Sequence, residues 1–167
     1  MHKRSFGFTV AFAVLVLDQV AKWIVSGPLH LRDVGQIVIL PIFNLTWTEN
    51  NGISLGLFNA TTEAGRWMLV ALTSAIAIGV AVWIGQEKHR WDQAALGMIL
   101  GGALGNILDR ASHGYVVEFA DLHFGAFRPF LVFNVGDAAI SIGVIILLLR
   151  AFLMRGQNEP KESVENA

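Results

Sequence analysis

Four long apolar stretches, separated by polar segments, dominate the chain. They cover about residues 6–25, 67–85, 93–108 and 135–152. A helix that crosses a bilayer needs about 20 apolar residues, and the first, second and fourth stretches meet that requirement. The third is short unless its helix continues through Asp109 and Arg110 near the water interface, as we expect. The pattern predicts an α-helical membrane protein with four transmembrane helices, at about 6–25, 67–85, 93–110 and 135–152.

The segments at 27–65 and 111–134 have the pattern of short strands. Leu45 and Trp47 alternate with threonines, which is the period-two signal of a strand. Pro41 interrupts the apolar run before them, so we expect two short strands there. The stretches GYVVEFADLHF (114–124) and FRPFLVF (127–133) are also rich in β-branched and aromatic residues. We predict a small extracytoplasmic β-sheet and loop cradle on the outer membrane face.

The composition agrees with a membrane location and narrows the chemistry. The 167-residue chain is 54% hydrophobic with a mean hydropathy of +0.55, more apolar than a small soluble domain. The net charge of −1 gives no argument for nucleic acid as a partner. There is no cysteine, which excludes disulfides and thiol catalysis. The H-E-x-x-H motif of zinc peptidases is also absent from the sequence.

Positive residues predict the topology, because lysine and arginine favour the cytoplasmic side. They occur in three connections that share one side of a four-span protein: Lys3 and Arg4, Lys88 and Arg90, and Arg155 and Lys161. Both termini are therefore expected in the cytoplasm. We expect a single domain over 1–155 and a disordered cytoplasmic tail over 156–167. Because the first stretch contains Asp18 and Lys22 and no small-residue cleavage site follows, we expect an uncleaved helix there.

Polar residues within the predicted spans converge on one depth. An ionisable residue at a helix centre costs about 2.5–3.5 kcal/mol and marks a functional site by default. In the predicted orientation, the outer-leaflet ends of three spans carry Asp18, Lys22, Asn106, Asp109, Arg110 and Asp137. One shared polar site explains them together. Asn106 and Arg110 lie beside a stripe of Gly97, Gly101 and Gly105, which favours close helix packing, so both should point into the bundle.

Each of these residues also has a purely structural interpretation. Asp18 and Lys22 are spaced i, i+4 and could neutralise each other. Asp109 and Arg110 could form an interfacial pair, which is the interpretation that we favour for Asp109. Asp137 could cap the last helix. A cap at Asp137 does not by itself explain Asn134, a second polar residue just upstream in FNVGD.

The residue types favour carboxylate chemistry. A metal site built from His123, Glu118 and Asp121 has no supporting ligand spacing. A Ser–Lys dyad would need Ser54 with Lys22, and its context is weak. Two carboxyls that share a site cannot both ionise easily, so one acts as an acid while the other activates water. This inventory fits an aspartic-type peptidase but does not by itself exclude a proton-coupled carrier.

Five motifs, in order, resemble the lipoprotein signal peptidase (signal peptidase II) family over nearly the whole chain. They are LDQVAK (17–22), NNGISLGLF (50–58), GGALGNILDR (101–110), VVEFADLHFG (116–125) and FNVGDAAISIG (133–143). The resemblance implies an aspartic endopeptidase of the bacterial inner membrane that needs no cofactor or metal. It implies cleavage of diacylglyceryl-modified prolipoproteins before the lipidated cysteine, with the active site towards the periplasm. We expect a monomer among membrane lipids, with no nucleic acid partner.

The resemblance also assigns residues. Asp137 corresponds to the second catalytic aspartate, and Glu118 occupies the position of the first. The supporting, substrate-binding positions are Asp18, Lys22, Asn50, Gly52, Asn106, Arg110 and Asn134.

Two departures from the family pattern affect these assignments. Glu118 replaces an aspartate, and an error of about 1 Å in placing a catalytic group can cost roughly 100-fold in rate. Either Glu118 or Asp121 could therefore partner Asp137; we favour Glu118, which keeps the 19-residue separation. Leu55 replaces an aromatic residue. The alternatives to a peptidase are a catalytically impaired paralogue that binds precursors and a small proton-coupled carrier.

Overall fold

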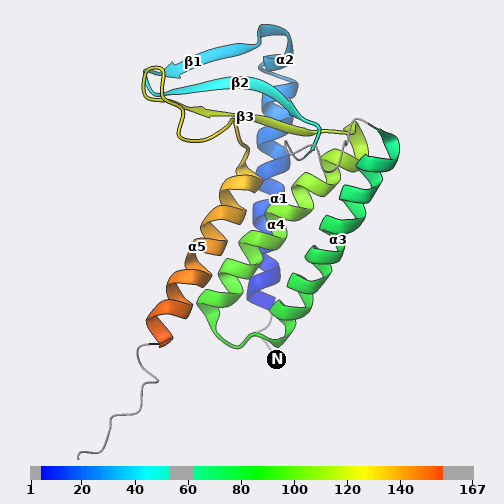
Figure 1. Cartoon of the computed structure of the whole chain (residues 1–167), viewed down its shortest axis with the longest axis vertical. Coiled ribbons are helices and arrows are strands. Elements are labelled where there is room, and N and C mark those ends of the chain that lie inside the picture. Colours follow the sequence, from blue (N-terminus) through cyan, green and yellow to red (C-terminus); the bar gives the residue numbers. More distant parts are fainter. Residues whose placement is uncertain (1–4, 53–61, 156–167) are drawn as a thin grey trace, which may run out of the picture.

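The computed structural model describes residues 5–52 and 62–155. Four long helices form a bundle, and a small sheet lies across one end of it (Figure 1). The elements are α1 (Ser5–Ser26), α2 (Leu31–Val34), β1 (Gln36–Leu40), β2 (Phe43–Asn50), α3 (Glu63–Gln86), α4 (Arg90–His113), β3 (Val116–Leu122) and α5 (Val135–Arg155). Each stretch expected to be helical lies within one of the four long helices. The start of α1 and the end of α5 lie at the end of the bundle away from the sheet.

Three helices of the described chain are long and apolar enough to cross a membrane: α1, α3 and α5. The third predicted span, at 93–110, lies in α4 and is not among them. It has 24 residues, but glycines and polar side chains lower its hydropathy. Because α1, α3 and α5 all pack against α4, much of its surface meets protein, and it needs a smaller apolar surface than its neighbours.

Three glycines of α4, spaced four residues apart, form the surface against which α1 packs. Gly97 and Gly101 lie directly against the backbone of α1, where a Cβ atom would collide with it. One turn further on, Gly105 lies against the carboxylate of Asp18. The predicted glycine stripe is thus confirmed as a site of close helix approach, and it holds the polar end of α1 against α4.

The sheet has the order β1-β2-β3, and both pairs of neighbouring strands are antiparallel. As predicted from Pro41, the 36–50 segment forms two strands rather than one, with a turn at residues 41–42. A bulge interrupts β2 between Leu45 and Thr48. Val117 and Phe119 of β3 belong to an apolar cluster that also includes Leu31 of α2. This cluster fixes the sheet to the end of the bundle.

The prediction of a strand at FRPFLVF was wrong. Residues 123–134 form a loop with two isolated bridges, Phe124 to Phe127 and Ala120 to Phe133. Pro129 has no N–H to donate to a ladder, and the chain reverses between Phe124 and Phe127. A high content of aromatic residues therefore gave a false strand signal in this segment.

Candidate active site

A buried ion triad lies between α1 and α4. The ammonium of Lys22 is 2.7 Å from Asp18 Oδ2 and 2.9 Å from Asp109 Oδ2, and no side chain of the three is more than 5% exposed. The predicted i, i+4 pair of Asp18 and Lys22 is therefore confirmed. The second carboxylate, that of Asp109, was not expected in this contact. With it, the triad holds one cation and two anions.

The interfacial pairing favoured for Asp109 was wrong. Asp109 is buried, and besides Lys22 it accepts hydrogen bonds from Gln19 Nε2 (3.2 Å) and from the backbone N–H of Val117 (3.0 Å). It thereby connects α1, α4 and β3. The sequence did contain a signal for this position, because Asp109 follows Gly105 by four residues and continues the stripe that faces α1.

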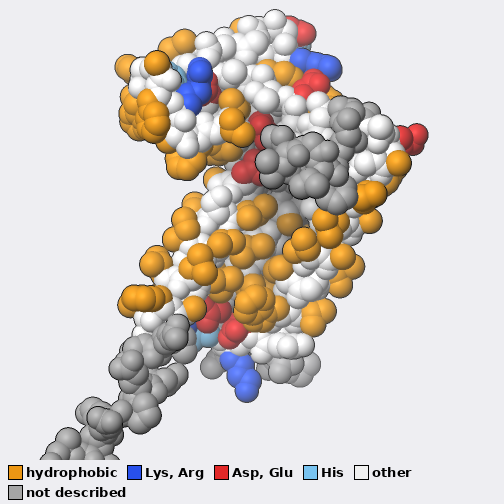
Figure 2. Space-filling model, viewed as in Figure 1, with side chains coloured by type: hydrophobic (Ala, Val, Ile, Leu, Met, Phe, Trp, Pro, Cys, Tyr) orange, Lys and Arg blue, Asp and Glu red, His pale blue; other side chains and the backbone are white. Residues whose placement is uncertain are grey.

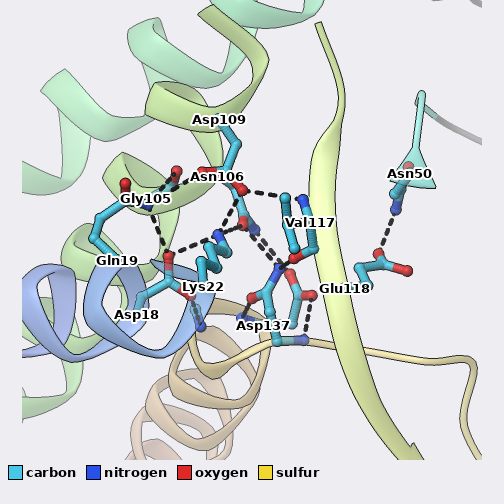
Figure 3. A network of polar contacts seen from close by, with 12 residues as sticks. Asp18, Gln19, Lys22, Asn50, Gly105, Asn106, Asp109, Val117, Glu118 and Asp137 are labelled. Atoms are coloured by element: carbon cyan, nitrogen blue, oxygen red, sulfur yellow. Dashed lines mark hydrogen bonds and ion pairs between the residues drawn. The ribbon is translucent and has the colours of Figure 1, made fainter. Parts of the chain in front are cut away.

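Asn106 connects the triad to Asp137 (Figure 3). Its side-chain oxygen accepts a hydrogen bond from Lys22 Nζ at 3.1 Å, and its Nδ2 donates to Asp137 Oδ1 at 2.8 Å. The amide of Asn134 also donates to the Asn106 oxygen, at 3.1 Å. With both donors directed at its oxygen, the Asn106 amide is held with its NH₂ group towards Asp137. The predicted inward orientation of Asn106 is confirmed.

The first turn of α5 is capped from two directions. Asn134 Oδ1 accepts from the Asp137 N–H at 2.8 Å, and Asp137 Oδ2 accepts from the Asn134 N–H at 3.2 Å. This reciprocal pair has the arrangement of a capping box. The backbone N–H of Gly136 donates to Asp18 Oδ1 at 2.8 Å. The capping interpretation of Asp137 is thus correct, and its other oxygen still faces Asn106.

Glu118 approaches the same region from β3. Asn50 Nδ2 donates to Glu118 Oε1 at 2.7 Å; Asn50 pairs with Val116, so the two side chains are diagonal neighbours across β2 and β3. Burial raises the pKa of Glu118; the hydrogen bond from Asn50 lowers it, and the charge of Asp137 raises it again. The net effect is a Glu118 pKa above the ordinary value, so this carboxyl keeps its proton to higher pH than a free glutamate.

Asp121 has different neighbours. It is 1% exposed, and its oxygens accept hydrogen bonds from Arg128 Nε (3.1 Å), Arg128 Nη2 (3.4 Å) and Thr46 Oγ1 (3.1 Å). Burial alone would raise its pKa, but the bonds from Arg128 and Thr46 outweigh this and hold the pKa below the ordinary value. The two carboxyls, three residues apart on β3, thus have different partners, which agrees with side chains on opposite faces of a strand.

Arg110 is half-buried and interacts electrostatically with Asp137, Glu118 and Asp109. Its Nε is buried and has no hydrogen-bond partner within residues 5–52 and 62–155. The predicted inward direction of Arg110 therefore agrees with the structure. Such a buried guanidinium N–H is available for a polar group of a bound molecule.

The remaining candidates lie around this centre or outside the described chain. The N–H of Gly52, a residue with φ of 136°, donates to Asn50 Oδ1 at 2.9 Å and helps to orient that amide. Ser54 and Leu55, and with them most of the NNGISLGLF motif, lie outside the described residues, as does the 156–167 tail. Within the described ranges, no three His, Asp or Glu side chains are placed to hold a metal ion.

An apolar cavity of about 320 Å³ opens beside Asp137. It is lined by Phe130, Phe133, Asp137, Ala138, Ser141 and Ile142. Figure 2 shows acidic side chains at the junction of sheet and bundle, above the apolar flanks of the helices. The arrangement combines Glu118, whose pKa is raised, with Asp137, which already accepts hydrogen bonds. The buried cation of Lys22 and an apolar cavity lie beside this pair. Such a site is suited to acid–base attack by water on a carbonyl of an apolar chain.

Comparisons of the sequence with known proteins give one family. A family model described as signal peptidase (SPase) II matches residues 10–153. The lipoprotein signal peptidase of Rhizorhabdus wittichii is 52% identical over 162 residues, which cover 97% of this chain and 94% of that protein. The lipoprotein signal peptidase of Sphingopyxis alaskensis is 53% identical, with 96% and 94% covered. A solved bacterial membrane enzyme, 26% identical, superposes with a TM-score of 0.78 over 93% of both chains.

Proposed function

The chain belongs to the signal peptidase II family, and we propose that it is an aspartic endopeptidase that removes signal peptides from diacylglyceryl-modified prolipoproteins. Cleavage takes place before the lipidated cysteine. Support comes from the two relatives named lipoprotein signal peptidase and from the carboxyl pair at the junction of sheet and bundle. Neither the family nor the site gives any reason to retain the proton-coupled carrier.

The catalytic proposal rests on Glu118 and Asp137, two carboxyls that hydrogen bonds from asparagine side chains hold where the sheet meets the bundle. They come from different elements, β3 and α5, yet the charge of Asp137 raises the pKa of Glu118. Each is held by its own amide, Asn50 for Glu118 and Asn106 for Asp137. Two carboxyls that cannot easily ionise together supply one acid and one base.

We assign the acid to Glu118 and the base to Asp137. Asp137 already accepts hydrogen bonds from Asn106 and from the Asn134 N–H, which suits a charged acceptor. In the reaction, Asp137 takes a proton from water as the water oxygen bonds to the scissile carbonyl carbon. Glu118 then gives its proton to the leaving nitrogen as the C–N bond breaks. The proton on Asp137 returns to Glu118 through solvent and restores the pair.

Asp121 has no role in this chemistry, because its oxygens are occupied by Arg128 and Thr46. Arg110 supplies the positive charge of the site, and its free Nε–H is available to the scissile carbonyl oxygen. The buried triad of Asp18, Lys22 and Asp109 holds Asn106 and the start of α5 in position. No step requires a metal ion or an organic cofactor.

The proposed orientation puts the sheet and the site on the periplasmic side of the bacterial inner membrane. The connection between α3 and α4, with Lys88 and Arg90, lies at the opposite end of the bundle. Positive residues favour the cytoplasm, so that end faces inward together with the start of α1 and the end of α5. Central α4, with 24 residues and a length of about 36 Å, crosses as the third of four spans. The apolar signal peptide enters laterally from the membrane.

A cleavage assay in detergent tests this function. The purified protein is incubated with a diacylglyceryl-modified prolipoprotein and with the same precursor lacking the lipid. We expect cleavage of the lipidated precursor only, and loss of at least about 100-fold in rate for Asp137→Asn. Asp33→Asn, which alters an exposed ion pair with His30, serves as the control and should cleave at the unaltered rate.

The alternative is a catalytically impaired paralogue that binds precursors without cutting them. The only observation in its favour is that Glu118 stands in place of an aspartate. This alternative predicts binding of the lipidated precursor with no product from the unaltered protein. If the unaltered protein cleaves the precursor and Asp137→Asn cleaves it at the same rate, the catalytic dyad is contradicted instead.

A further inference from the structure

The loop between β3 and α5, residues 123–133, forms one wall of the cavity beside Asp137; we call it the roof loop. Phe130 and Phe133 line this cavity together with Asp137. The Phe133 N–H bonds to the Ala120 carbonyl at 3.0 Å, which fixes the far end of the loop to β3. The position of this loop therefore sets the shape of the cavity in which a substrate would meet Asp137.

Phe133 packs against the apolar cluster that contains Leu31 and Val117, but hydrophobic burial contributes little to holding the rest of the roof loop. Phe124, Phe127, Phe130 and Leu131 are 52%, 66%, 62% and 82% exposed. Side chains left this exposed gain little from the hydrophobic effect within the protein. A loop of this composition needs a specific polar contact to keep one position relative to the sheet.

Arg128, in the middle of the roof loop, makes such a contact. Its Nε and Nη2 donate to the two carboxylate oxygens of Asp121, at 3.1 and 3.4 Å. A two-pronged bond from a guanidinium to a carboxylate is directional as well as charged. The Asp121 end is rigid, because that residue is buried within β3 and also accepts from Thr46 at 3.1 Å.

Thr46 in turn accepts a hydrogen bond from Gln36 Nε2 at 2.9 Å. Gln36 belongs to β1, Thr46 to β2 and Asp121 to β3. The chain of contacts thus links all three strands to Arg128. Although the guanidinium of Arg128 is partly in solvent, its partner is buried, so loss of the cation would leave a desolvated carboxylate with one donor fewer.

We propose that the Asp121–Arg128 pair positions the roof loop over the cavity beside Asp137 and thereby sets the affinity for the lipidated precursor. Asp121 is then a positioning residue and takes no part in bond cleavage. The inference rests on the proposed function and deepens it, because it assigns substrate affinity to a part of the protein outside the carboxyl dyad.

Steady-state kinetics on the lipidated precursor in detergent tests the proposal. The variants are Asp121→Asn, Arg128→Gln and the double variant, with Asp33→Asn as an exposed ion-pair control. We expect each single variant to raise KM roughly tenfold and to change kcat by less than about twofold, as for residues that act only on binding. The double variant should be no worse than either single variant, since both remove the same interaction.

Hydrogen exchange on the same proteins gives a readout independent of catalysis. Faster exchange is expected in residues 123–133 of both single variants, with the core of the bundle unchanged. Unchanged KM together with unchanged exchange would overturn the proposal. A fall of 100-fold or more in kcat at constant KM for Asp121→Asn would overturn it too, because it would make Asp121 part of the dyad. If the unaltered protein cleaves nothing, the proposed function fails, yet the exchange data still decide whether the pair holds the loop.

Discussion

The side-chain amide of Asn50 donates a 2.7 Å hydrogen bond to Glu118 Oε1, across the β2–β3 pair. This contact holds the glutamate that stands where the family pattern has an aspartate. The longer side chain reaches a donor on the neighbouring strand, which orients one oxygen and stabilises the charged form. Burial and the charge of Asp137 act in the opposite direction, and the net effect is a raised pKa for Glu118.

The pH dependence of cleavage should follow from this balance. If protonated Glu118 is the acid, kcat falls as pH rises through its raised pKa. Asn50→Leu removes an interaction that lowers the pKa of Glu118, so the pKa rises further and the alkaline limb of the kcat profile moves to higher pH. Asn51→Leu is the control, since the Asn51 amide lies 3.5 Å from the Glu49 carbonyl rather than on Glu118. An alkaline limb that moves to lower pH in Asn50→Leu would contradict the assignment.

Replacement of the cation in the buried triad should be strongly destabilising. Lys22→Met leaves Asp18 and Asp109 buried without their counter-charge, at an expected cost of about 3–5 kcal/mol in unfolding free energy. Thermal unfolding in detergent measures the loss. The double variant Lys22→Met/Asp109→Asn removes one of the two unpaired buried charges and should recover part of the unfolding free energy.

Arg32→Gln is a suitable comparison for the triad, because it breaks an exposed ion pair with Glu49. Such a pair contributes about 0–1 kcal/mol. Equal losses from Lys22→Met and Arg32→Gln would mean that the triad is not the buried unit described above.

A methyl group at Gly105 should disturb the contact between α1 and α4. The new Cβ would collide with the Asp18 carboxylate, which also receives Lys22 and the Gly136 N–H. Gly105→Ala is expected to cost about 1–3 kcal/mol through overpacking and to reduce kcat. Circular dichroism melts and the cleavage assay measure both effects.

Gly79→Ala is the matched control, because a Cβ there meets no atom within 4 Å. Alanine is the better helix former by about 1 kcal/mol, so this variant should be as stable as the unaltered protein or slightly more so. Destabilisation of both variants to the same degree would show that the Asp18 contact is not the cause.

The apolar pattern was sufficient to predict the four long helices and the division of the sheet at Pro41, since both follow from local residue order. It also predicted that Asn106 and Arg110 point inward, because the neighbouring glycines mark the packed face of α4. The pattern alone could not show why α4, which has a lower hydropathy than the other three long helices, needs a smaller apolar surface. That helix is enclosed by three others, which is a tertiary property.

The role of Asp109 was missed for a related reason. Two adjacent opposite charges suggested a pair, but consecutive residues of a helix point about 100° apart. Asp109 therefore faces α1, and Arg110 faces the carboxyls of the site. The Asp121–Arg128 contact could not be predicted either, because the aromatic sequence around Pro129 was taken for a strand instead of a loop.

The rate of cleavage by Glu118→Gln decides whether Glu118 acts as the catalytic acid. Glutamine keeps the size of the side chain and can still bond to Asn50, but it cannot supply a proton as the carboxyl does. We predict that kcat for a diacylglyceryl-modified prolipoprotein falls by at least about 100-fold, with the fold intact by circular dichroism and with KM little changed. Cleavage by Glu118→Gln at the unaltered rate would remove Glu118 from the catalytic pair.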